Sequence, residues 1–283
     1  MSAFKSLFGK AFGIEVSSDK IQATKGLVLG GNGEPKIILG DASTAAWFED
    51  FIGSTDTGAP QGIVKVAGDT GVNHGGVEGG PGGIYRITLG DTPAAAAATA
   101  GSGITAGRNF QINSGPNNTS GRTRVGARIK ASNFNDTGRR LSLFFGLTDT
   151  GLAQMPIYDT GGAAVVSAAS NAVGFIIGSR ADTGVSGVAV SGDTDRTAVA
   201  LDTGALAPGK WTTLEVELTR GPGDTGGTAT FFIDGRVLGS ISSPVASEIG
   251  LAPSVYAFPE DTGGGMVIDV DWIGASTLRD TGS

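Results

Sequence analysis

The sequence contains no cysteine and a single histidine, His74. Without cysteine the chain forms no disulfide and offers no thiolate to a metal ion, and one histidine cannot supply a histidine-based metal triad. A Ser-His-Asp system would have to use His74, and no Gly-x-Ser-x-Gly motif contains or precedes this residue. Because His74 lies among glycines, we expect it in an exposed loop, and the sequence predicts no bound cofactor.

Long apolar runs are also missing. No stretch approaches the roughly 20 apolar residues that a membrane-spanning helix requires, so we predict no membrane span. Residues 1–13 lack the uninterrupted apolar segment and the small-residue cleavage site of a signal peptide, and we therefore expect synthesis in the cytoplasm. The net charge of −7 at pH 7 disfavours a nucleic-acid partner, because binding to nucleic acid depends on neutralising phosphates.

Glycine is the residue in excess, with 49 copies among 283 residues. No Gly-x-y period runs through the chain, which excludes a collagen-like structure. Serine, threonine and aspartate accompany the glycines, and this mixture is typical of tight turns between short strands. The chain length suits one large all-β domain.

The clearest structural signal lies in residues 211–241. From Thr212 to Thr219 the residues alternate, with leucine and valine on one face and two glutamates on the other. A period of two indicates a strand with one buried face. Asp234-Gly235 lies between two apolar runs and predicts a hairpin, because both residues tolerate positive φ. Three consecutive antiparallel strands are therefore expected here.

Similar signals predict about fourteen short strands with turns between them, which is the pattern of a sandwich or barrel. The glycine-rich residues 68–83 and the alanine-rich residues 93–107 are predicted as loops. The strands are expected at residues 47–52, 62–67, 84–89, 108–113, 122–130, 141–147, 173–178, 185–190, 196–201, 211–219, 228–233, 236–241, 254–258 and 266–273.

These motifs carry a resemblance. Trp-x-x-Leu-x-Val-x-Leu at residues 211–218, followed by a glycine turn and Phe-Phe-Ile-Asp-Gly-x-Val-x-Gly-Ser at residues 231–240, resembles the late strands of concanavalin-A-like (laminin-G-like) jelly-roll domains. Residues 266–273 are similar to the last strand of that fold, and residues 47–52 to its first. The resemblance covers residues 42–279 and implies an all-β, antiparallel two-sheet jelly-roll sandwich.

Residues 1–40 are expected to form an anchoring arm distinct from the jelly-roll domain, residues 41–283. Residues 27–29 and 36–39 flank a Gly-Gly-Asn-Gly turn and predict a hairpin. Four apolar residues at helical spacing predict a short amphipathic helix at the start of the arm. Three roles stay open for it: packing on its own domain, docking on another chain, or binding a membrane surface. The four residues are Phe4, Leu7, Phe8 and Phe12.

One predicted strand, residues 122–130, carries cations along one face and apolar residues along the other. Two interpretations stay open for this cationic face. Its charges are solvated or paired within the chain, or they form a docking surface for an acidic neighbouring subunit. The candidate docking residues on this face are Arg122, Arg124 and Arg128, and Lys130 lies beside them.

The last predicted strand raises the question of glycosidase activity. Asp269 and Asp271 are expected to share one face of this strand, with Trp272 on the other. Related jelly-roll glycosidases carry Glu-x-Asp-x-(x)-Glu here, with the two glutamates as nucleophile and acid. This sequence has Val267 and Ile273 at the glutamate positions. We therefore expect no catalytic pair, and expect both aspartates to pair with arginines of a neighbouring strand.

The tripeptide Asp-Thr-Gly recurs ten times at irregular spacing, so it is not a solenoid repeat. It is also the catalytic signature of aspartic proteases, but the bracing apolar-apolar-Gly segment, residues 175–178, precedes the best copy at Asp202 instead of following it. Turns explain all copies, because aspartate caps its own backbone and glycine takes positive φ. Calcium binding by some of these carboxylates is an open alternative. The copies begin at Asp56, Asp69, Asp136, Asp149, Asp159, Asp182, Asp202, Asp224, Asp261 and Asp280.

Two functions from different classes fit these observations. The first is a non-enzymatic structural protein of a tailed-bacteriophage virion, because a jelly-roll domain with a short N-terminal arm resembles such proteins. It would decorate or project from the capsid or tail as an oligomer, with other virion proteins as partners. The second is a lectin-like module that binds a host surface glycan, although aromatic residues are scarce at 7%. A glycoside hydrolase of the same fold is the third.

Overall fold

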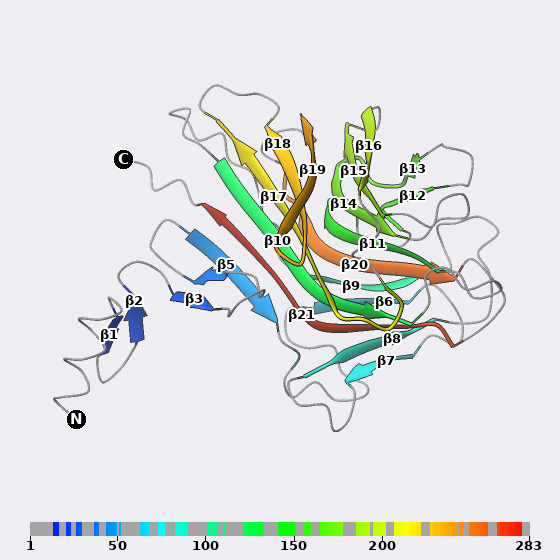
Figure 1. Ribbon diagram of the computed structural model, residues 1–283, viewed down its shortest axis with the longest axis horizontal. Coiled ribbons are helices and arrows are strands. Elements are labelled where there is room, and N and C mark those ends of the chain that lie inside the picture. The colour runs from blue at the N-terminus through cyan, green and yellow to red at the C-terminus, as the bar shows by residue number, and fades with distance from the viewer. Residues whose placement is uncertain are drawn as a thin grey trace.

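The computed structural model is built from two antiparallel β-sheets that face each other (Figure 1). In the described part of the chain no helix is long and apolar enough to cross a membrane. The structure describes residues 14–16, 21–23, 27–29, 37–39, 44–49, 51, 63–67, 73–76, 83–89, 101–106, 110, 121–132, 141–150, 155–159, 165–177, 185–192, 195–201, 207–221, 227–242, 244–245, 249–259 and 265–278.

The eight-stranded sheet is centred on two long strands, β10 and β21, which pair antiparallel. Its strands follow in the order β19 (Arg236–Ser242), β18 (Thr228–Ile233), β17 (Thr212–Arg220), β10 (Gly121–Ala131), β21 (Val267–Leu278), β8 (Tyr85–Thr88) and β7 (Asn73–Gly76), and β5 (Thr44–Glu49) pairs with β21 as well.

The seven-stranded sheet packs against it. Its strands follow in the order β16 (Asp195–Leu201), β15 (Val185–Ser191), β14 (Ala172–Ile177), β11 (Leu141–Thr148), β20 (Ala252–Pro259), β9 (Ser102–Ala106) and β6 (Ile63–Ala67). Three small hairpins complete the described strands: β1 (Ile14–Val16) with β2 (Ile21–Ala23), β3 (Leu27–Leu29) with β4 (Ile37–Leu39), and β12 (Ile157–Asp159) with β13 (Val165–Ser167).

The main core lies between the two sheets and is built from apolar residues on the inward faces of their described strands. In β17, Leu214, Val216 and Leu218 are fully buried in it, as their alternation predicts. The rings of Phe175 on β14 and Phe231 on β18 meet edge to face, with their centroids 5.3 Å apart, and this contact joins the sheets. The predicted all-β two-sheet antiparallel sandwich is confirmed.

Two predicted loops contain strands, and this part of the prediction was wrong. β7 lies within residues 68–83 and places His74 in a strand instead of a loop, and β9 lies within residues 93–107. Both are rich in small residues, so their pairing depends on the neighbouring strands and not on local propensity. In residues 108–113 the described part holds only a bridge, between Phe110 and Leu251.

The predicted hairpin at Asp234-Gly235 is confirmed, with φ values of 49° and 75° at the two turn residues. The Asp234 carboxylate also accepts a hydrogen bond of 2.9 Å from the backbone N–H of Thr213. We predict that Gly235→Ala lowers the free energy of unfolding by about 1 kcal/mol, because a β-carbon is disfavoured at this φ. Urea unfolding checks this value. Val237→Ala is the control, since Val237 is 58% exposed and its loss should change little.

The hairpin predicted at residues 27–39 is confirmed as β3 and β4. β4 lies beside β5 and β21, at the edge of the sandwich. The predicted amphipathic helix with Phe4, Leu7, Phe8 and Phe12 falls outside the described residues. The division into an arm and a jelly-roll domain therefore stays a prediction.

Candidate functional site

The surface of the eight-stranded sheet that points away from the core, called here the outer face, carries an array of charged side chains. On β10 the residues at even positions point to this face, while Val125, Ala127 and Ile129 point into the core. The predicted cationic face is therefore confirmed. Carboxylates from the strands on either side of β10 pair with its cations.

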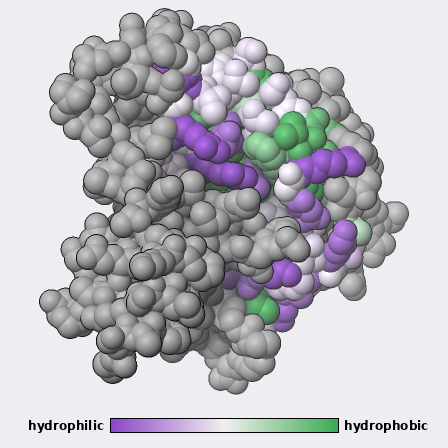
Figure 2. Space-filling model, turned by 60° about the vertical axis from the view of Figure 1, so that its left-hand side comes forward, coloured by the Kyte–Doolittle hydropathy of each residue, from purple (hydrophilic) through white to green (hydrophobic). Residues whose placement is uncertain are grey.

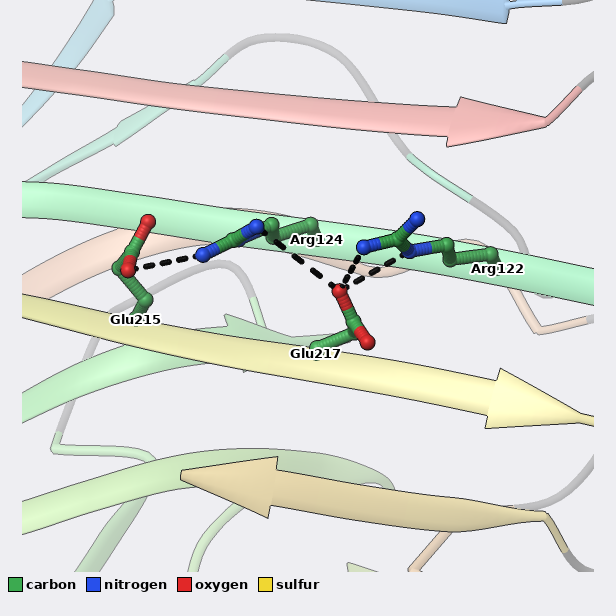
Figure 3. Close-up of polar contacts among 4 residues, drawn as sticks. All are labelled: Arg122, Arg124, Glu215 and Glu217. Carbon is green, nitrogen blue, oxygen red and sulfur yellow. Dashed lines mark hydrogen bonds and ion pairs between the residues drawn. The ribbon is translucent and has the colours of Figure 1, made fainter. Parts of the chain in front are cut away.

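The first group of ion pairs joins β10 to β17 (Figure 3). Arg122 contacts Glu217 through Nε, at 2.9 Å, and through Nη2. Arg124 donates from Nη2 to Oε2 of Glu215 at 2.9 Å and lies 3.9 Å from Glu217. The Arg124 guanidinium also lies over the Phe232 ring, 5.3 Å from its centroid. Two cations and two carboxylates balance in this group.

The second group is centred on Asp269 of β21. Arg86 of β8 donates from Nε to Oδ1 of Asp269 at 2.6 Å and from Nη2 to Oδ2 at 2.9 Å. Lys130 Nζ lies 2.9 Å from Oδ2. Burial alone would raise the pKa of Asp269, but the hydrogen bonds from Arg86 and Lys130 outweigh it and hold this pKa below its usual value. The hydrogen bond to Asp269 in turn raises the pKa of Arg86. The carboxylate is therefore charged at neutral pH.

Trp211, just before β17, contacts Lys130 and one further cation, Arg128. Lys130 Nζ lies 4.8 Å from the centroid of its ring, and the Arg128 guanidinium carbon lies 5.3 Å from it. Arg128 also donates to Asp271 at 2.8 Å. Cation–π contact and ion pair together restrict the movement of these long side chains.

A β-bulge places Trp272 on the outer face, so the expectation that it lies on the face opposite Asp269 and Asp271 was wrong. The pairing of β10 with β21 shifts after Arg128, which lies opposite Trp272, and this shift leaves Asp271 unpaired in the ladder. The Trp272 ring lies over Gly126, where a β-carbon would approach it to 3.1 Å. It stacks on Phe48 of β5 with centroids 5.9 Å apart, and Phe48 is 37% exposed.

The cations of the outer face are more exposed than their partners. Their side chains are 26% to 48% exposed, whereas those of the four carboxylates are 2% to 23% exposed. Figure 2, which brings the left-hand side of Figure 1 forward, shows hydrophilic and hydrophobic side chains next to each other on this side. The positively charged groups are therefore more accessible to a partner than the carboxylates, of which Glu215 and Asp269 are buried and Glu217 and Asp271 half-buried. The five cations are Arg86, Arg122, Arg124, Arg128 and Lys130, and the four carboxylates are Glu215, Glu217, Asp269 and Asp271.

The pairing of Asp269 and Asp271 with cations of neighbouring strands is confirmed, although Lys130 shares Asp269 with an arginine. The structure also brings Arg122, Arg124 and Arg128 together on one face. Sequence reasoning missed Arg86, Phe48 and the position of Trp211. Among the described residues no group of three histidine or acidic side chains is arranged to hold a metal ion.

Two of the Asp-Thr-Gly copies begin within the described residues. Asp149 lies in a bend after β11, as a turn residue should, and accepts a hydrogen bond of 3.0 Å from Asn171 Nδ2. Asp159 is the last residue of strand β12, and the Thr-Gly that follows it lies outside the described residues, so the turn stays a prediction for this copy. The other eight aspartates lie outside the described residues.

The face of the seven-stranded sheet that points away from the main core is largely covered by apolar side chains in the described part of the chain. Met155, Ile157 and Ala169 form a second apolar cluster with Phe144 and Tyr256, on the side of the seven-stranded sheet that faces away from the main core. Burial raises the pKa of Tyr256 to about 12, although a backbone hydrogen bond at Gly101 acts in the opposite direction. This side is packed with apolar groups, so the candidate site is the outer face of the eight-stranded sheet.

No protein-family model matches the sequence, and no curated protein matches it. An endo-1,3-beta-glucanase from Streptomyces sioyaensis is similar in structure, with a TM-score of 0.54 and 13% identity over 87% of this chain and 100% of the glucanase. Peanut lectin has a TM-score of 0.51 and 14% identity over 85% of this chain and 100% of the lectin. At these identities the likeness shows the fold alone. The chain has the concanavalin-A-like jelly-roll fold.

Proposed function

We propose that this chain is a non-enzymatic structural protein of a tailed-bacteriophage virion. In this role the jelly-roll domain decorates or projects from the capsid or the tail, in several copies, and residues 1–40 attach it to neighbouring subunits. The resemblance of a jelly-roll domain with a short arm to virion proteins supports the phage context. The cations exposed above buried carboxylates support a role in binding.

The outer face suits an acidic neighbouring subunit. The chain as a whole carries a net charge of −7, yet this face presents cations outward. Complementary charges steer association and suppress wrong partners. The proposed docking residues are Arg122, Arg124 and Arg128. Their ion pairs limit the movement of the guanidinium groups before a partner binds. Less side-chain entropy is then lost when the partner arrives.

Deletion of residues 1–40 tests the attachment. In cells that produce the phage particle, we expect the truncated chain to be absent from purified particles, because the proposed anchor is gone. Immunoblotting of the particles against the cell lysate measures incorporation. A thermal unfolding curve of the purified truncated chain is the control for folding. Normal incorporation of the folded, truncated chain would contradict the proposal.

Carbohydrate binding is the second candidate function. The observation that favours it is the Phe48–Trp272 stack on the outer face, with Phe48 partly exposed beside charged side chains. An aromatic surface with a few fixed polar groups is the usual chemistry of a small-molecule site. The fold occurs in a lectin and in a glucanase, which makes such a role compatible with the architecture.

A further inference from the structure

The charges of the outer face are not evenly balanced. Arg122 and Arg124 face two carboxylates, and Arg128 faces Asp271. Arg86 and Lys130, by contrast, share the single charge of Asp269, so one positive charge remains in excess at this point. Among the described ion pairs of this face, the uncompensated charge is therefore localised on β8 and β10, on either side of β21.

The two cations at this point are held in place and are accessible. Arg86 is fixed by a two-pronged contact with Asp269, and its side chain is still 44% exposed. Lys130 is fixed between Asp269 and the Trp211 ring and is 29% exposed. Asp269 itself is 2% exposed and lies beneath them. An approaching anion therefore meets positioned donors before it meets the carboxylate.

A partly exposed aromatic stack lies further along the same face. Trp272 is three residues beyond Asp269 on β21 and on the same face, which corresponds to roughly 10 Å at the rise of a strand. Its ring stacks on the partly exposed Phe48, whose strand partner Gly274 lies five residues beyond Asp269, or roughly 16 Å along β21. A ligand longer than one sugar ring can therefore contact the cations and the aromatic stack together.

We propose that Arg86 and Lys130 form a binding site for the carboxylate or sulfate groups of an acidic polysaccharide, with a sugar ring against Phe48. This inference rests on the second candidate function, carbohydrate binding, and names its ligand class. An acidic sugar combines an anionic group with an apolar ring face in one unit, and the outer face offers a partner for each. Arginine suits such anions because its guanidinium carries five N–H donors, and Arg86 contacts Asp269 through Nε and Nη2 only, which leaves Nη1 for the ligand.

Calorimetric titration of the full chain with polygalacturonate, at low ionic strength, tests the site. We expect binding that weakens as salt is added. Arg86→Gln should weaken it about tenfold, and Phe48→Ala roughly fivefold. Arg236→Gln is the matched control, because it removes an exposed cation from β19, at the other end of the same sheet, and it should change binding less than twofold. Thermal unfolding of each variant establishes that it is folded.

Further titrations distinguish a failure of the acidic ligand class from a failure of carbohydrate binding itself. Equal binding of the neutral polymer dextran would overturn the acidic ligand class while carbohydrate binding stands. If poly-glutamate binds as tightly as polygalacturonate, the site recognises negative charge alone. That result would contradict the assignment of a polysaccharide as the ligand. If neither polysaccharide binds, both proposals fail. Equal weakening by Arg86→Gln and Arg236→Gln would show that Arg86 is not part of the binding site.

Discussion

Phe231→Ala is expected to lower the free energy of unfolding by about 3–5 kcal/mol, the usual range for a buried phenylalanine. The ring is completely buried and meets Phe175 of the opposite sheet edge to face. It also lies against Gly187 of β15, where a β-carbon would approach the ring to 2.8 Å. Because the sheets fit this tightly around the ring, we expect them to close only partly over the cavity. Urea unfolding followed by tryptophan fluorescence measures the change.

Phe232→Ala is the matched control, since the next residue on β18 points to the outer face. Phe232 is half-buried, and its ring lies beneath the Arg124 guanidinium. Its loss should cost about 1 kcal/mol, from the cation–π contact and some apolar area. If the two substitutions were equally destabilising, the Phe231 ring would not make the expected large contribution to packing between the sheets.

Asp269→Asn is expected to lower the free energy of unfolding by about 2 kcal/mol at pH 7. Breaking a buried ion pair typically costs 3–5 kcal/mol, but Arg86 and Lys130 are 44% and 29% exposed and can turn to water. Asp271→Asn is the control, because Asp271 is 23% exposed and pairs with Arg128 in the described structure, and it should cost less than about 1 kcal/mol. Urea unfolding of the variants at pH 7 measures both values.

The pH dependence of the Asp269→Asn difference follows from the direction of its pKa shift. The hydrogen bonds from Arg86 and Lys130 outweigh burial and lower the pKa of the folded state. The contribution is therefore complete above the ordinary carboxyl pKa of about 3.9 and is lost as the pH falls through the folded value. The difference in unfolding free energy between wild type and variant should be constant from neutral pH down to about 5 and smaller at pH 3. A difference that grows on acidification would contradict this ion-pair account.

Sequence reasoning succeeded where one face of a strand is apolar. Residues 212–219 and 122–130 were placed correctly, because a strand buried on one face must alternate. Asp234-Gly235 was identified because positive φ restricts the residues that can occupy the turn. Such local signals were sufficient to predict the sandwich and its cationic face.

The rest depends on contacts between distant parts of the chain. The position of Trp272 is determined by a bulge in the pairing with β10, and no residue of β21 alone shows that the alternation breaks there. Arg86 reaches Asp269 because β8 pairs with β21 across 183 positions of sequence. Glu215 was expected on the exposed face of β17, yet it is 2% exposed, with Phe232 opposite it on β18 and Arg124 donating to its carboxylate.

The pairing of β21 has a consequence for synthesis on the ribosome. This strand follows every other described strand in the chain, yet it pairs with β5, β8 and β10, all made much earlier. Until residues 267–278 leave the exit tunnel, the edges of β5, β8 and β10 that pair with β21 keep unpaired backbone groups, although β7 can pair with β8 and β17 with β10. The nascent chain therefore exposes unpaired strand edges through most of translation. A ribosome that stalls before β21 would release a product prone to aggregation.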